Sequence, residues 1–167
     1  APRGCSRPRR EISTNWETCS TVIPELGHVS LIIALALAVG LAAVPMWGAL
    51  RRDIAAMNTA PSLAVGVTVF VGIAFALLAV SFLQDDFSVA VVAANSNSLL
   101  PPIFKFSAVW GNHEGSLLLW VLILSGWMTA VAYFSRGLPL EMVARVLSVM
   151  GMVAVGFLAF SLLTSNP

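Results

Sequence analysis

Residues 31–50 read LIIALALAVGLAAVPMWGAL, a run of 20 residues without a charged side chain. A helix rises 1.5 Å per residue, so about 20 residues cross a hydrocarbon core of about 30 Å. Lipid cannot hydrogen-bond to backbone N–H and C=O groups, so a spanning segment must satisfy its own backbone. The run also lacks the alternation of period two that a membrane β-barrel strand shows. It therefore predicts a transmembrane helix.

Three further apolar runs follow this one along the chain. They cover residues 62–83, 116–134 and 146–163, with 22, 19 and 18 residues. The whole chain is 58% hydrophobic and only 10% charged, whereas soluble proteins carry about 25% charged residues. We therefore predict an all-α polytopic membrane protein whose four transmembrane helices span about 28–50, 62–83, 116–134 and 143–163.

Small residues at four-residue spacing predict where these helices pack together. Lipid tails are as apolar as leucine, so helices in a membrane associate where small side chains let their backbones approach closely. The small residues that we assign to helix interfaces are Ala34, Ala38, Ala42, Gly72, Ala76, Ser125, Gly126, Thr129 and Ala130.

The basic residues of the loops predict the orientation in the membrane. Arg51 and Arg52 lie between the first two helices, and Arg136 and Arg145 lie around the third connection, whereas the middle loop 84–115 holds only Lys105. Loops rich in arginine and lysine stay in the cytoplasm. The loop 84–115 is therefore expected to be periplasmic, in a bacterial inner membrane.

The leading segment differs in composition from the remainder. Residues 1–21, APRGCSRPRREISTNWETCST, are polar and show no helical or strand periodicity, and the apolar character begins at Val22. We predict a disordered or non-native leader, with a native start at Val22, ahead of a membrane region at 22–167. Cys5 and Cys19 form no pattern at metal-ligand spacing, so no metal site is predicted. The charge distribution gives no indication of nucleic-acid binding.

The middle loop contains two features of local structure. Pro101 and Pro102 precede a short apolar run at 103–110, and proline is tolerated at a helix start, so we predict an interfacial or re-entrant helix there. Trp110 and Trp120 are expected to bracket the outer membrane boundary, where amphipathic rings prefer to lie.

The stretch GNHEGS at 111–116 leads directly into the third spanning helix. Glu114 and Ser116 suit a helix N-terminus, because that end of the macrodipole is positive and its N–H groups need acceptors. His113 could ligate haem iron or a metal, since neutral imidazole is a common iron ligand. The sequence shows no partner ligand for it, so a hydrogen-bonded structural role is favoured. The case for His28 is weaker.

Four stretches together resemble the CcmF family, the haem lyases of the multi-protein System I pathway of cytochrome c maturation. They are VIPELGH at 22–28, DDFSVAVVAANSNSLLP at 85–101, KFSAVWGNHEGSLLLW at 105–120 and TSNP at 164–167. The family often has tyrosine where this chain has Val91 and Phe104. The resemblance covers 22–167 and identifies the chain as an N-terminal fragment of a CcmF-type protein. The related NrfE proteins share this pattern, so the target cytochrome stays open.

The resemblance implies an enzyme that takes haem from the haem chaperone CcmE and attaches it to the CXXCH motif of apocytochrome c. It further implies haem b in the full-length protein and partners of the CcmH/CcmI type, which are thiol-redox and chaperone subunits. The family's tryptophan-rich segment and haem-ligating histidines would lie beyond Pro167. We therefore expect no catalytic, haem-binding or metal residue here and no lyase activity of this piece alone. A structural or interface role is assigned to the motif residues Trp110, Gly111, His113, Glu114, Gly115, Ser116 and Trp120.

A transporter or a membrane subunit of a respiratory complex is the alternative from another class of protein. Such proteins place ionisable residues inside the membrane, because those residues carry the proton or the ion. The four apolar runs hold none, which favours helices that form a scaffold or handle a cofactor.

Overall fold

A computed structural model describes residues 13–83, 107, 109, 111 and 113–164, and these residues are helical or lie in short turns. The helices are α1 (Ser13–Arg51), α2 (Ile54–Asn58), α3 (Ala60–Leu83), α6 (His113–Phe134) and α7 (Leu140–Thr164). A short 3-10 helix, η1 (Ser135–Gly137), connects α6 to α7. No strand occurs within the described ranges.

Four stretches are long and apolar enough to cross a membrane. They are Glu25–Arg51, Ile54–Leu83, Gly115–Phe134 and Leu140–Thr164, which confirms the predicted all-α fold with four spans. The predicted interfacial helix at 103–110 lies outside the described residues, apart from Ser107 and Val109. Val109 is buried and packs with Phe82 at the end of α3.

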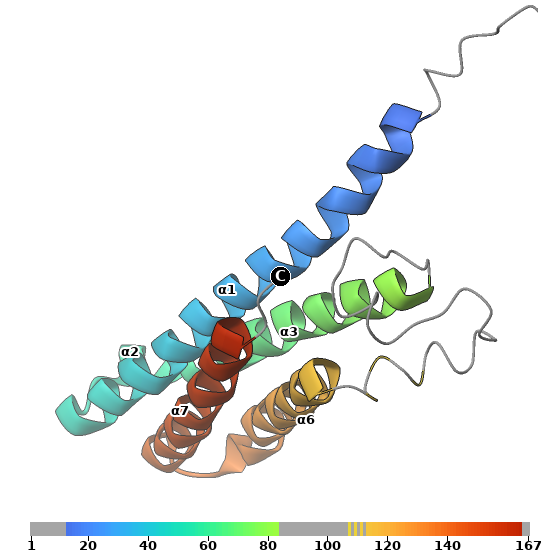
Figure 1. Cartoon of the computed structure of the whole chain (residues 1–167). Helices are drawn as coiled ribbons and strands as arrows, with labels where there is room; N and C mark the ends of the chain where they lie inside the picture. The colour runs from blue at the N-terminus through green and yellow to red at the C-terminus, as the bar shows by residue number, and fades with distance from the viewer. Residues whose placement is uncertain (1–12, 84–106, 108, 110, 112, 165–167) are drawn as a thin grey trace, which may run out of the picture.

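The N-terminal end of α1 extends well past the other helices (Figure 1). The leader at 1–21 was predicted to lack regular structure, but α1 begins at Ser13, so Ser13–Thr21 are helical. Adding a residue to an existing helix costs far less than nucleating a new one, and the apolar span behind provides such a helix. The proposed native start at Val22 stays a prediction.

The four long helices form a closed ring in the order α1, α3, α6, α7. α1 packs against α3 and α7, and α6 packs against the same two helices from the other side. The centre of the ring is a continuous apolar core to which every long helix contributes. Its fully buried members include Ala34, Ala38, Leu41, Ala64, Val67, Val71, Val121, Met128, Leu147, Ala154 and Leu158.

Small side chains pack between the helices, and many large apolar side chains point away from the bundle. The buried faces of α1 and α3 carry mainly alanine and valine, whereas many large side chains point outward, among them Trp47, Trp127 and Leu163. In water such an outer surface would drive aggregation, but lipid tails solvate it as well as a protein core would. The ring is therefore built for a lipid solvent.

α7 packs closely against α1 at Gly151. A Cβ atom placed on Gly151 would lie 3.1 Å from the backbone nitrogen of Ala42 and 3.1 Å from Cγ of Leu41. Ala34 and Ala38 are fully buried on the same side of α1. The predicted alanine row of the first helix is therefore confirmed as an interface, and α7 supplies a glycine opposite it.

Of the other small residues that were predicted to lie at helix interfaces, some are buried and some are exposed. Ser125 is fully buried, but Ala76 and Gly126 are exposed. α3 instead buries a face that begins with Ala60, Ala64 and Val67. Pairs of small residues are so common in apolar helices that spacing alone did not select the correct face.

A polar contact inside the ring joins α3 to α6. Thr68 Oγ1 lies 2.7 Å from the backbone oxygen of Ser125, 2.8 Å from Thr129 Oγ1 and 3.0 Å from the backbone oxygen of Ala64. Interhelical hydrogen bonds of this kind stabilise membrane bundles by about 0.6–1.7 kcal/mol. Thr68 thus fixes the register of α3 against α6.

Candidate functional site

The family motif found in the sequence lies at the start of α6. α6 is described from His113 onward, and Gly111 two residues earlier is also helical; Glu114, Gly115 and Ser116 follow His113 in the helix. Ser116 Oγ donates to the backbone oxygen of His113 at 3.4 Å. The hydroxyl of Ser116 therefore acts as a donor to the preceding turn of the helix. The sequence predicted that it would accept a hydrogen bond from a free backbone N–H.

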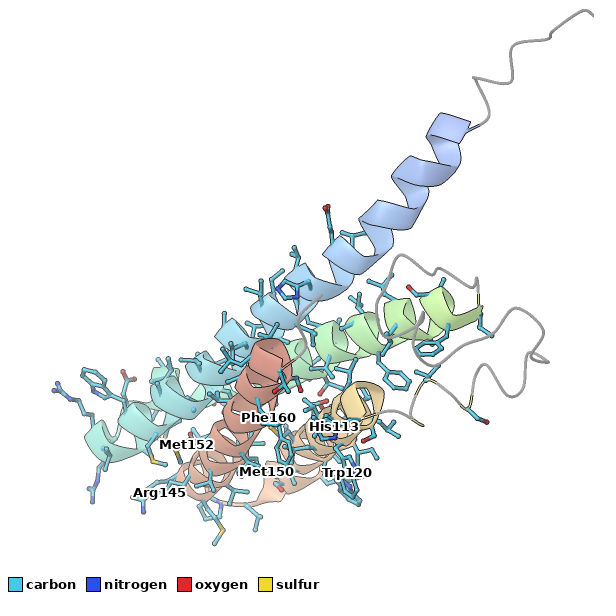
Figure 2. The ribbon with its side chains drawn as sticks, viewed as in Figure 1. His113, Trp120, Arg145, Met150, Met152 and Phe160 are labelled. Carbon is cyan, nitrogen blue, oxygen red and sulfur yellow. The ribbon has the colours of Figure 1, made fainter. Side chains whose placement is uncertain are left out.

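The side chain of His113 contacts α7. Its ring meets the ring of Phe160 edge to face, with centroids 6.4 Å apart and planes at 85°. Figure 2 shows the two residues next to each other, at the end of α7 away from Arg145. The partner of His113 described here is an aromatic ring, whereas a hydrogen bond was expected, and the structural role favoured from sequence stays a prediction.

A groove continues from this contact between α6 and α7. Its volume is about 320 Å³, and it is lined almost entirely by apolar atoms of Leu117, Val153, Gly156, Phe157 and Phe160. Leu117 follows His113 by four residues and so lies on the same face of α6. The imidazole of His113 therefore lies next to Phe160 at one end of this groove, which fits an apolar chain or another helix side chain.

Sequence reasoning missed the groove because its determinants lie on two helices. Phe157 and Phe160, three residues apart on α7, were available as a signal, since residues at this spacing share a helix face. Gly156 next to them leaves space, because a Cβ atom there would meet nothing within 4 Å.

Trp120 faces away from the groove. It is 65% exposed, and Trp127, seven residues later on the same helix, is 64% exposed; Figure 2 shows the Trp120 side chain projecting from the outer side of α6. These two rings form a lipid-facing stripe. Trp110 lies outside the described residues, so its place at the boundary stays a prediction.

A buried hydroxyl belongs to the residue that follows Phe160, which lines the groove. Ser161 follows Phe160 on α7, and its Oγ atom is buried without a hydrogen-bond partner in the described part of the chain. Such an atom is uncommon, because a buried unpaired hydroxyl is costly.

The described side chains do not assemble a site for metal or haem iron. No group of three or more His, Cys, Asp or Glu side chains occurs among the described residues. His28 lies on α1 and His113 on α6, and these helices are not neighbours in the ring. The apolar runs at 31–50, 62–83 and 116–134 carry no charged side chain, so the groove between α6 and α7 offers apolar contact with the imidazole of His113 nearby.

These helices are similar to cytochrome c biogenesis proteins. A family model described as "Cytochrome C assembly protein" matches residues 110–167, which include α6 and α7. Over 146 residues, or 87% of this chain, the sequence is 58% identical to the "Cytochrome c-type biogenesis protein CcmF" of Pseudomonas aeruginosa. Over the same length it is 49% identical to the CcmF protein of Escherichia coli and 42% identical to the NrfE protein of Haemophilus influenzae.

The match covers only part of these relatives. The chain spans 22% of the length of the Pseudomonas aeruginosa protein and 23% of the other two. A solved structure entitled "Cytochrome c Heme Lyase CcmF" has the same fold over 99% of this chain and 26% of its own length, with a TM-score of 0.81 and 23% sequence identity. The family resemblance seen in the four sequence stretches is confirmed.

Proposed function

We propose that this chain, which belongs to the CcmF family of cytochrome c-type biogenesis proteins, is the N-terminal membrane scaffold of a haem lyase. The complete protein would accept haem from the haem chaperone CcmE and deliver it to the CXXCH motif of apocytochrome c. It would work with thiol-redox and chaperone subunits of the CcmH/CcmI type. The high identity to CcmF relatives over 87% of the chain is the observation that carries this proposal.

The arrangement of the helices supports a scaffold role for this part. The four spans contain no ionisable side chain at their centres, and the ring is closed by small-residue packing and the Thr68 hydrogen bonds. The histidines described here do not fit a haem-iron site on their own. We therefore assign haem ligation and chemistry to other parts of the complete protein, and assign no lyase activity to these helices alone.

The orientation belongs to the same proposal. With the arginine-bearing ends in the cytoplasm, α6 begins at the periplasmic side of the inner membrane, where His113 and the groove would face the compartment in which apocytochromes receive haem. Cysteines introduced at residues 95 and 52 test this. An impermeant maleimide should label the first in intact cells and the second only after lysis, and the reverse pattern would refute the orientation.

Complementation tests the function itself. Cells lacking their own CcmF protein would receive the complete natural gene carrying either Gly151→Leu or Gly156→Leu, and haem-stained c-type cytochromes would be measured beside the amount of the variant protein. We expect Gly151→Leu to abolish holocytochrome and Gly156→Leu to retain at least half, because only Gly151 lies in a closed interface. Normal cytochrome levels in cells without the wild-type gene would refute the assignment.

A further inference from the structure

A compact turn joins α1 to α2 at the end of the ring opposite His113. We call residues 47–56 the elbow. A Cβ atom on Gly48 would lie 2.8 Å from Cβ of Ala56 and 3.0 Å from the nitrogen of Met57, so α2 folds back directly onto the last turn of α1. The nitrogen of Asp53 donates to the oxygen of Gly48 at 2.9 Å. This bond closes the end of α1 in the manner of a Schellman motif.

Arg52 occupies the left-handed position of this motif, with φ of 58°. It is the one non-glycine residue with positive φ in the described part of the chain. The position after a helix end usually holds glycine, because a side chain there crowds its own backbone. Conformation alone would favour glycine at 52, so the guanidinium is kept there against a conformational cost.

The elbow leaves its two positive charges unpaired. Oδ1 of Asp53 accepts from the nitrogens of Ala55 at 2.9 Å and Ala56 at 3.4 Å and so caps α2. Within the described residues, neither Arg51 nor Arg52 has an ion pair. At the same end of the ring, Arg145 is paired with Glu141. Two exposed guanidinium groups at adjacent positions therefore face solvent or lipid head groups.

The surroundings of these charges place them at the level of lipid head groups. The first span ends at Arg51, and the second begins at Ile54. The guanidinium of Arg51 lies 4.9 Å above the ring of Trp47, and tryptophan with arginine is the pair that anchors helices at membrane interfaces. Leu50 and Ile54 are both largely exposed beside them, so acyl chains can lie against these residues.

We propose that the elbow is a binding site for an anionic phospholipid. Arg51 and Arg52 donate to the phosphate oxygens of one head group, a geometry for which guanidinium is suited, while Trp47, Leu50 and Ile54 contact its glycerol region and acyl chains. A general preference for arginine in cytoplasmic loops explains the positive charge of this loop. It does not explain an arginine at a left-handed position.

Lipid retention in native mass spectrometry tests the site. The complete natural protein would be released from nanodiscs of equal parts phosphatidylglycerol and phosphatidylcholine, and bound lipids would be counted. Each surface arginine near a membrane contributes about 1 kcal/mol to attraction of anionic lipid, or about fivefold in affinity. We expect Arg52→Gln to lower phosphatidylglycerol retention about fivefold and the Arg51→Gln/Arg52→Gln double variant to lower it about thirtyfold.

Three single variants keep the proposal falsifiable. Arg145→Gln removes the same charge at the same end but from an existing ion pair, so retention should change less than twofold. Arg52→Gly relieves the left-handed backbone and should lose retention like Arg52→Gln, which separates charge from folding. Arg52→Lys keeps the charge but loses the planar guanidinium, so its retention should lie between that of the wild type and that of Arg52→Gln.

Several results would overturn the proposal. An equal loss for Arg145→Gln and Arg52→Gln would mean that total charge alone attracts the lipid. Unchanged retention in the double variant would remove the site. Glycerol phosphate or inorganic phosphate that displaces the lipid at micromolar concentration would identify a free-anion site and refute a lipid site.

Discussion

Two glycines of α7, Gly151 and Gly156, have opposite surroundings. A side chain on Gly151 would collide with the backbone of α1, whereas a side chain on Gly156 would enter open space. Five residues rotate a helix by about 140°, so the two positions face different neighbours. The comparison shows that the ring is closed tightly at the α1–α7 contact and is open at the end of the α6–α7 contact where His113 and Phe160 meet.

Replacing each of these two glycines separately by leucine tests the difference between the closed and the open contact most strongly. Gly151→Leu should lower the free energy of unfolding by about 3 kcal/mol or more, because overpacking forces backbones apart. Gly156→Leu adds the same side chain to the same helix but fills the groove, so its effect should stay below about 1 kcal/mol. Unfolding in mixed detergent micelles, followed by circular dichroism, measures both. Equal losses would mean that the groove is closed.

Gly48→Ala extends the test to the elbow. The added methyl would lie 2.8 Å from Cβ of Ala56, and α2 would have to move. We expect a loss of about 1–3 kcal/mol in the same micelle assay. Gly137→Ala is the matched control, since a Cβ atom there meets nothing within 4 Å. A neutral Gly48→Ala would show that α2 does not fold back onto α1.

Thr68→Val asks how much of the α3–α6 contact depends on hydrogen bonds. Valine keeps the shape but removes the bonds to the oxygens of Ser125 and Thr129, and the expected loss is about 1 kcal/mol. Thr164→Val removes a hydroxyl that, among the described residues, bonds to Phe160 of its own helix, so it should change stability by less than about 0.5 kcal/mol. Equal effects of the two substitutions would contradict an interhelical role for Thr68.

Gly156→Ala should produce the smallest change, and of the opposite sign. Alanine favours the helical backbone over glycine by about 0.5–1 kcal/mol in helix interiors, and the structure leaves room for its methyl group. The midpoint of unfolding in detergent should therefore rise slightly. A loss of stability above about 1 kcal/mol would indicate that something fills the groove.

The sequence predicted the spans well because the requirement for lipid solubility acts on every residue of a span. The runs at 62–83 and 116–134 correspond to helices ending at Leu83 and Phe134. The alanine row at Ala34 and Ala38 was predictable for the same physical reason, since close packing in lipid needs small residues.

The interior of the site was less predictable than the spans. The contact of His113 with Phe160 joins residues that are distant in sequence, and periodicity within one helix cannot reveal which face of the next helix it meets. The bond from Thr68 to Ser125 could not be predicted either, because threonine and serine also occur in apolar helices without contacting another helix. The elbow at Arg52 needed backbone angles that composition does not encode.

The contact of Gly151 with Ala42 joins the last long helix of the described chain to the first. During synthesis α1 enters the bilayer before α3 and can pair with it early, but its alanine face toward α7 stays uncovered until α7 has inserted. Helices of membrane proteins insert first and associate later. The α1–α7 contact therefore cannot form before α7 is in the bilayer, and a chain that stalls earlier leaves the alanine face of α1 without this partner.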